Sequence, residues 1–208
     1  MNKLIPASLG LVGAGSLGIG GWIAFKPKMI NPYKEKYKTA IIEEKSSLWE
    51  TKFLALKGKS PINEKLKKAA GTSESEDIRK GKHKEGCREI YESSTQDSKY
   101  LDDFKQYCSK NNGDVLSSGW ISEVPTSSIT STSSSKWHGK LTSLKNNKDR
   151  ETHPFLKSLA TKLTGDTFNK TQGDELKGWC DSQKGEIFLG DKDHSFQLIK
   201  SYCVEGNA

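Results

Sequence analysis

Hydrophobic positions recur in the same order twice along this chain. Each run opens with a tryptophan followed by apolar residues four and seven positions later: Trp49, Phe53 and Leu56, then Trp137, Leu141 and Leu144. Each run closes on an amphipathic stretch that ends in Tyr-Cys: Leu101, Phe104, Lys105, Tyr107 and Cys108, then Phe196, Ile199, Lys200, Tyr202 and Cys203. These spacings are typical of helices with one buried face. A pattern that occurs twice predicts two small repeated helical modules, one after the other.

Local composition predicts where most of the helices lie. Residues 33–56 are rich in Lys, Glu, Ala and Leu and contain neither Gly nor Pro, which predicts one long helix. Ser60-Pro61 predicts the start of another helix, because Ser can cap a helix and Pro is tolerated in the first turn. Pro154 matches Pro61 in the second copy. Further helices are predicted over 99–110, 174–183 and 191–203. The polar residues 71–86 predict a loop, or a loop with a short exposed helix. The predicted fold class is therefore mainly α.

The predicted organisation has four parts. Residues 1–28 form an N-terminal membrane anchor or signal segment, and residues 29–113 form the first helical module. Residues 114–136 are a linker rich in Ser and Thr, and residues 137–208 form the second module. Because Ser and Thr dominate residues 122–136, this stretch lacks the apolar side chains needed to bury itself, and we expect it to be flexible.

The N-terminal segment predicts contact with membrane lipid. Residues 4–25 carry no charge over 22 positions, enough at about 1.5 Å per residue to cross a bilayer core about 30 Å thick. Residues 13–18 match the G-x-G-x-x-G pattern of dinucleotide-binding proteins, but the polar stretch 26–59 offers no second buried strand. We therefore expect an N-terminal transmembrane helix and no cofactor. Removal of the segment as a secretory signal stays open.

Two observations predict opposite orientations of the chain across the membrane. Five lysines crowd the C-terminal flank of the segment: Lys26, Lys28, Lys34, Lys36 and Lys38. The positive-inside rule would keep that flank in the cytoplasm. Paired cysteines, in contrast, are typical of an oxidising exterior. We expect a single-pass protein of the cell membrane with its body outside the cell, and the opposite orientation stays open.

The four cysteines allow three interpretations. Pairing Cys87 with Cys108 and Cys180 with Cys203 encloses similar loops, of 20 and 22 residues, and each disulfide would stabilise a thin core by about 3 kcal/mol. The cysteines could instead be reduced and packed as small hydrophobic residues. Metal binding is the third interpretation, since His83 and Cys87 are four residues apart. Short paired ligand motifs such as C-x-x-C are absent from the sequence, so we expect no metal site.

Catalysis and nucleic-acid binding have little support in the sequence. Lys57-Gly58-Lys59-Ser60 ends like a phosphate-binding loop, but the glycine required upstream falls on Phe53. The net charge is +7, and residues 28–110 hold 19 basic and 14 acidic side chains while residues 111–208 hold 12 of each. A nucleic-acid binder usually concentrates its basic residues on one face. We therefore expect no catalytic residues, no nucleic acid and no small-molecule substrate.

The whole arrangement resembles the large paralogous sets of uncharacterised proteins from haemotrophic mycoplasmas. The residues that carry the resemblance are Met1-Asn2-Lys3 leading into residues 4–25, then Trp49, Trp137, and the endings 104–108 and 199–203. The resemblance implies no activity and no site residue. It implies a membrane-associated, surface-exposed protein of a wall-less bacterium, one of many antigenic variants.

Two functions follow as expectations. The first is a non-enzymatic surface protein whose two helical modules contact a host-cell surface protein or an antibody, in host interaction or antigenic variation. The alternative is a cytoplasm-facing scaffold whose basic, membrane-proximal half lies on anionic lipid with its cysteines reduced.

Overall fold

The computed structural model of the 208-residue chain describes residues 31–96 and 98–206. The predicted transmembrane segment, residues 4–25, and the glycine motif within it lie outside the described residues. Among the described residues, no helix has the length and apolar character needed to cross a membrane.

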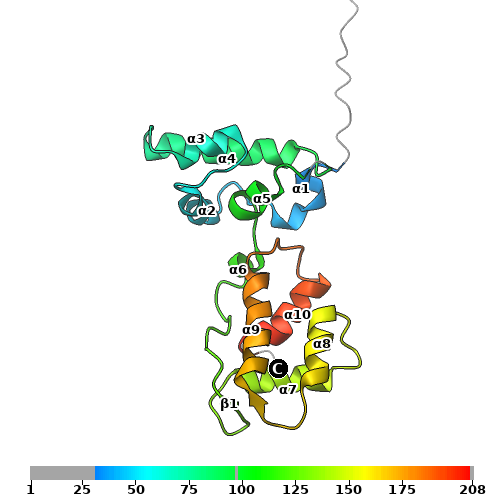
Figure 1. Ribbon diagram of the computed structural model, residues 1–208. Helices are drawn as coiled ribbons and strands as arrows, with labels where there is room; N and C mark the ends of the chain where they lie inside the picture. Colours follow the sequence, from blue (N-terminus) through cyan, green and yellow to red (C-terminus); the bar gives the residue numbers. More distant parts are fainter. Residues whose placement is uncertain (1–30, 97, 207–208) are drawn as a thin grey trace, which may run out of the picture.

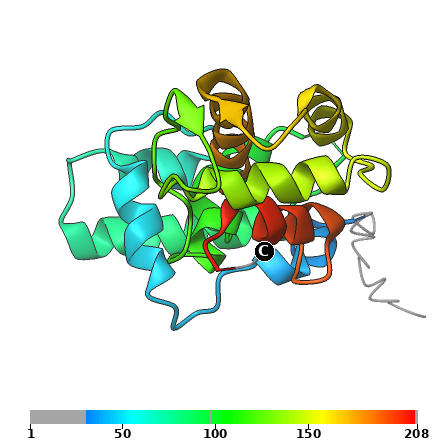
Figure 2. The ribbon, with the colours of Figure 1, turned by 90° about the horizontal axis from the view of Figure 1, so that it is seen from below.

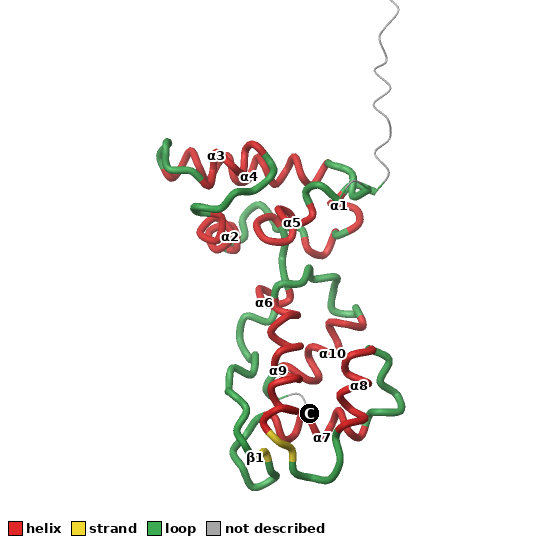
Figure 3. Tube along the Cα trace, viewed as in Figure 1, coloured by secondary structure: helices red, strands yellow, loops and turns green. Residues whose placement is uncertain are grey.

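The described chain is mainly helical, which confirms the predicted fold class in its broad form (Figures 1 and 3). The first half contains α1 (Tyr33–Lys36), a 3-10 turn η1 (Lys38–Ala40), α2 (Leu48–Leu56), α3 (Glu64–Ala70), α4 (Glu76–Glu92), α5 (Leu101–Asp103) and a π-helical turn η2 (Phe104–Cys108). The second half contains α6 (Asn112–Val115), β1 (Ser128–Ile129), α7 (Trp137–Asn146), α8 (Pro154–Lys162), β2 (Phe168–Asn169), α9 (Lys170–Lys184) and α10 (His194–Cys203).

Two separate hydrophobic cores hold these elements together. The first core joins α1 to η2 and includes Trp49, Leu56, Leu66, Ile90 and Phe104. The second core joins α7 to α10 and includes Trp137, Leu141, Leu156, Leu176 and Ile199. Figure 1 shows the two bodies one above the other, and Figure 2 shows α7 and α10 side by side in the second body.

The predicted long helix over residues 33–56 is wrong. It breaks into α1, η1, an extended stretch from Ile41 and α2. Ile41 pairs with Ser109 as an antiparallel bridge, and the Trp49 indole N–H donates to the Glu43 carbonyl at 2.9 Å. Ser46 Oγ accepts from the backbone N–H of Leu48 at 3.2 Å. These tertiary and capping contacts outweigh the helix propensity of the segment.

The helix that begins within the polar stretch 71–86 is neither short nor fully exposed, in contrast to the expected loop or loop with a short exposed helix. Residues 76–92 form α4, the longest helix of the described chain. Its buried positions recur every three or four residues, at Arg79, His83, Gly86 and Cys87. Two of these side chains are polar, so hydrophobicity alone does not mark the buried face. The buried Nε–H of Arg79 has a hydrogen-bond partner, since it donates to the Ala69 carbonyl at 3.0 Å.

The start of α3 also differs from the prediction. Asn63 caps α3, accepting from the backbone N–H groups of Lys65 and Leu66, and Pro61 lies before the helix. Pro154, in contrast, is the first residue of α8, which His153 caps. The two prolines therefore do not occupy matching positions. The buried residues do match when the helix starts are aligned: Leu66, Ala69 and Ala70 on α3, then Leu156, Leu159 and Ala160 on α8.

The Ser/Thr-rich stretch before α7 packs against the second core, contrary to the expected flexible linker. Ile121 and Ile129 within it are 2% and 0% exposed. β1 pairs antiparallel with β2, placing Ile129 opposite Phe168. The Trp137 indole N–H donates to the Glu123 carbonyl at 3.0 Å. Two isoleucines and one indole therefore anchor a segment whose average composition predicts no core.

Hydrogen bonds join the two bodies where α6 meets α9. Asn111 pairs with Ile187 as an antiparallel bridge, and the Phe188 backbone N–H donates to the Lys110 carbonyl at 3.0 Å. Lys52 reaches into this junction from α2. Its ammonium lies 2.7 Å from an Asp114 carboxylate oxygen and 2.6 Å from Asn111 Oδ1. The buried ammonium of Lys52 thus ties the first body to α6.

Candidate functional site

The four cysteines form two disulfides with the predicted pairing. Cys87 on α4 bonds to Cys108 at the end of η2, with a Cα–Cα distance of 5.2 Å. Cys180 on α9 bonds to Cys203 at the end of α10, with a Cα–Cα distance of 5.5 Å. All four side chains are buried. Each disulfide lies within one core and joins its longest helix to the Tyr-Cys ending.

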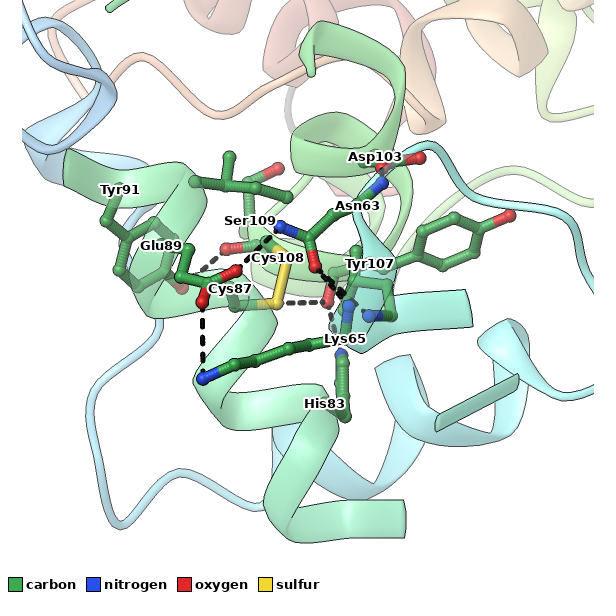
Figure 4. The surroundings of a disulfide bond; sticks show 12 residues. Asn63, Lys65, His83, Cys87, Glu89, Tyr91, Asp103, Tyr107, Cys108 and Ser109 are labelled. Atoms are coloured by element: carbon green, nitrogen blue, oxygen red, sulfur yellow. Dashed lines mark hydrogen bonds and ion pairs between the residues drawn. A yellow bond between two sulfur atoms is a disulfide. The ribbon is translucent and has the colours of Figure 1, made fainter. Parts of the chain in front are cut away.

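Polar groups surround the first disulfide, as Figure 4 shows. His83 lies one helical turn before Cys87 on α4, and its Nε2 is 2.9 Å from the Tyr107 carbonyl oxygen. The same oxygen lies 3.6 Å from Cys87 Sγ. The Tyr91 hydroxyl donates to the Cys108 carbonyl at 2.6 Å. These contacts join α4 to η2 in addition to the covalent bond.

A buried carboxylate holds the start of α3 beside this disulfide. Asp103 accepts from the backbone N–H groups of Ile62 and Asn63, at 2.8 and 2.7 Å. The Asn63 amide donates in turn to Glu89 on α4 at 3.0 Å. Burial raises the pKa of the Asp103 carboxyl, and the two backbone donors partly offset that effect. The network therefore fixes α3, α4 and α5 around the sulfur atoms.

Burial lowers the pKa of the His83 imidazole, and the backbone carbonyl of Tyr107 only partly opposes this. Only 1% of the residue is exposed. The Trp49 and Phe53 rings lie against the imidazole, with centroid distances of 5.4 and 6.1 Å. A desolvated imidazole favours its neutral form, in which one ring nitrogen keeps a free lone pair.

The second disulfide has a more apolar setting. Leu176, 0% exposed, occupies the position one turn before Cys180 that His83 occupies before Cys87. The tyrosine of its Tyr-Cys ending makes a side-chain contact, since the Tyr202 hydroxyl lies 3.3 Å from a Glu151 carboxylate oxygen. Burial and the Glu151 carboxylate raise the pKa of Tyr202 to about 12. The two disulfides therefore share their connectivity but not their chemistry.

A buried lysine follows each opening tryptophan by three positions. Lys52 and Lys140 are 6% and 4% exposed. Lys140 Nζ donates to the Ser201 carbonyl at 2.9 Å, and burial lowers its pKa. Lys52 pairs with Asp114 at the junction. Both ammonium groups join separate elements, which is a structural role.

Two of the cavities on the described surface lie near the residues discussed above. One, of about 280 Å³, opens between α2 and α4, and its lining includes Trp49, Phe53, His83 and Lys84. The other, of about 510 Å³, lies between the two bodies and includes Tyr37 and Ile187 in its lining. His83 therefore lies in the wall of the smaller cavity although only 1% of the residue is exposed.

The four histidines lie on different elements of the described chain. His153 caps α8, His138 contacts the Asp166 carbonyl at 3.1 Å, and His194 contacts the Thr152 hydroxyl at 2.9 Å. His83 alone joins a cluster of possible ligands among the described residues, because its ring and the Cys87 and Cys108 sulfurs lie within 4.8 Å of one another.

The sequence shows the His83–Cys87 spacing, but the approach of Cys108 depends on the tertiary fold. The structure brings Cys87 and Cys108 into one site and places Cys180 and Cys203 in another, each within its own core. No protein-family model, curated protein or solved structure matches the chain.

Proposed function

We propose that this chain is a non-enzymatic, single-pass membrane protein that presents two helical modules outside the cell. There the modules contact a host-cell surface protein or an antibody, in host interaction or antigenic variation. One observation carries the proposal. Each of two separate cores contains its own fully paired, buried disulfide. Disulfides form and persist in oxidising environments and are rare where thiols are kept reduced.

The size of the modules gives a physical reason for the disulfides. Only 33% of the chain is hydrophobic, and small domains with little apolar surface are often held by covalent links. The two disulfides close loops with sequence separations of 21 and 23 residues. Loops of that size correspond to about 3 kcal/mol each in the chain-entropy model. An extracellular module gains this stability without a larger core.

A duplication accounts for the shared features of the two modules. Each has an opening tryptophan whose indole donates to an upstream carbonyl, at 2.9 and 3.0 Å. Each has a buried lysine three residues later, at Lys52 and Lys140, and a disulfide that ends in Tyr-Cys. Departures such as His83 against Leu176 are then changes made after the copies separated. Tandem copies of a small module suit a surface protein that varies its exposed face.

The anchor completes the proposal. Residues 4–25 are uncharged, and α1 begins at Tyr33, so the first module follows the membrane segment closely. The chain would thus be held by lipid and exposed through its two modules.

Surface labelling of intact cells tests this proposal. Cells that make the full chain are treated with a membrane-impermeant amine reagent, which reacts with exposed lysines such as Lys148 and Lys192. We expect labelling of intact cells to match that of lysed cells, while a cytoplasmic protein in the same cells stays unlabelled. Labelling only after lysis would contradict the proposal and favour the cytoplasm-facing scaffold on anionic lipid.

A further inference from the structure

The first disulfide lies inside a set of atoms that resembles a soft-metal site. The imidazole of His83 and the sulfurs of Cys87 and Cys108 lie within 4.8 Å of one another. His83 is 1% exposed and both cysteines are 0% exposed. Imidazole and two thiolates are the ligands that Zn²⁺ prefers. While the sulfurs are bonded to each other, however, they are poor ligands.

We propose that reduction of the Cys87–Cys108 disulfide creates a Zn²⁺ site formed by His83, Cys87 and Cys108. The reductant is a small-molecule thiol: two thiol molecules give two electrons and two protons to the disulfide and become a disulfide themselves. Zn²⁺ then displaces the protons of the two cysteine thiols, which leave to solvent. A metal link thereby replaces the covalent link between α4 and η2.

The ligands stay close together after reduction because other contacts hold them. His83 and Cys87 are four residues apart on α4, so both side chains lie on the same face of the helix. Two hydrogen bonds fix η2 against that face: one between His83 and the Tyr107 carbonyl at 2.9 Å, and one from Tyr91 to the Cys108 carbonyl at 2.6 Å. Neither depends on the sulfur–sulfur bond.

His83 also forms part of the lining of the cavity of about 280 Å³ between α2 and α4. Water completes the four ligands that Zn²⁺ takes when a protein supplies three.

The second module provides an internal comparison. Cys180 and Cys203 are also buried and bonded, but Leu176 stands where the first module has His83. Reduction there gives two thiols without an imidazole. The proposal therefore assigns one Zn²⁺ to the reduced chain and places it in the first module. It is independent of the proposed surface function, since it concerns only what the chain does under reducing conditions.

Zinc binding by the reduced chain tests the proposal. The full chain, purified in a mild detergent, is reduced with a phosphine, freed of reductant without oxygen, and titrated with Zn²⁺ against a competing chelating dye. We expect one tightly bound Zn²⁺ per reduced chain and none in the oxidised chain. Co²⁺ in place of Zn²⁺ is expected to show the charge-transfer absorption of thiolate ligands.

Variants distinguish this site from binding at other places. His83→Leu, which copies the second module, should weaken Zn²⁺ binding about tenfold or more, and Cys87→Ser with Cys108→Ser should abolish it. His138→Leu is the matched histidine control and should bind like the natural chain, as should Cys180→Ser with Cys203→Ser. The proposal would be overturned if His83→Leu bound Zn²⁺ as tightly as the natural chain, or if either control lost binding.

The fold of the reduced chain is followed in the same samples by circular dichroism. Where reduction unfolds the first module, Zn²⁺ should restore the helical signal in the natural chain and fail to restore it in His83→Leu. A reduced chain that retains no Zn²⁺, or that gains no helical signal from it after unfolding, would overturn the proposal as well.

Discussion

Gly86 on α4 lies so close to Asn63, the cap of α3, that a Cβ on Gly86 would be 2.9 Å from Asn63 Oδ1. The same Cβ would be 2.9 Å from Leu66 Cδ2. Gly86 therefore lets α3 approach α4 directly beside Cys87. The close approach of α3 and α4 makes a small core possible around the first disulfide.

Replacing Gly86 with Ala should destabilise the first module. The added methyl group must displace Asn63 or Leu66, and overpacking of this kind costs about 1–3 kcal/mol. Gly81→Ala on the same helix is the matched control, because a Cβ there meets open space. It should stabilise the module by about 0.5–1 kcal/mol through helix propensity. Urea denaturation measures the free energy of unfolding of the two variants. Equal changes in that free energy would contradict the close packing of α3 on α4.

Removing either disulfide should destabilise its own module more than the other. Cys87→Ser with Cys108→Ser should lower the free energy of unfolding of the first module by about 3 kcal/mol. Because the two cores are separate, unfolding should then occur in two steps, with the first module melting earlier. Hydrogen exchange during urea denaturation would resolve the steps. Simultaneous loss of protection in both modules would show that they form one cooperative unit.

The stability of the first module should fall in mild acid because of His83. Burial lowers the pKa of this imidazole from its ordinary 6.5 in the folded chain. The unfolded chain therefore binds a proton there at a higher pH than the folded chain does. The stabilising contribution is complete above about pH 6.5. Below that value it is lost, at up to about 1.4 kcal/mol per pH unit, until the pH reaches the lower pKa of the folded chain.

The variant His83→Leu isolates this contribution. The difference in unfolding free energy between the natural chain and the variant should shift in favour of the variant as the pH falls from about 7.5 to about 5. Subtraction removes the titration of groups common to both proteins. A difference that does not change with pH would mean that His83 keeps an ordinary pKa in the folded chain.

Removing the Lys52 ammonium should loosen the junction between the modules. Lys52→Met leaves Asp114 and Asn111 without the cation that lies 2.7 and 2.6 Å away. Breaking a buried ion pair can cost about 3–5 kcal/mol, and we expect a smaller loss here because the Asp114 side chain is 18% exposed. Faster hydrogen exchange at the Asn112 amide, which donates to the Glu186 carbonyl at 3.0 Å, would report the change.

The exposed pair of Lys34 and Glu92 provides the control for that experiment. Lys34 lies 2.6 Å from Glu92, but its side chain is 46% exposed, and such surface pairs contribute about 0–1 kcal/mol. Lys34→Met should leave the Asn112 exchange rate unchanged. Equal exchange in the two variants would show that Lys52 does not hold the junction.

The sequence predicts the cysteine pairing and the two tryptophan-led cores because both depend on spacings that are visible in the chain. Matched loop lengths identify the disulfide partners, and the offsets from Trp49 and Trp137 identify buried faces. These loop lengths and offsets can be read from the sequence itself, so the three-dimensional structure is not needed to find them.

Other features depend on contacts that no local pattern contains. The helix expected over residues 33–56 breaks because Ile41 pairs with the distant Ser109. The chain before α7 packs through a few scattered apolar residues, among them Ile121 and Ile129, which composition averages conceal. The length and the buried face of α4 escape prediction because that face includes the polar His83. The same histidine reaches Cys108 only through the fold, so the cluster around the first disulfide cannot be read from spacing.

Peptide mapping of the native chain without reductant is the most direct test of two separately closed modules in an oxidising compartment. The protein is isolated from the cells that make it, with free thiols blocked at lysis, and digested. We predict one cross-linked peptide pair that joins Cys87 to Cys108 and another that joins Cys180 to Cys203. Four blocked thiols, or any bond between the two modules, would contradict this structure and the surface location proposed from it.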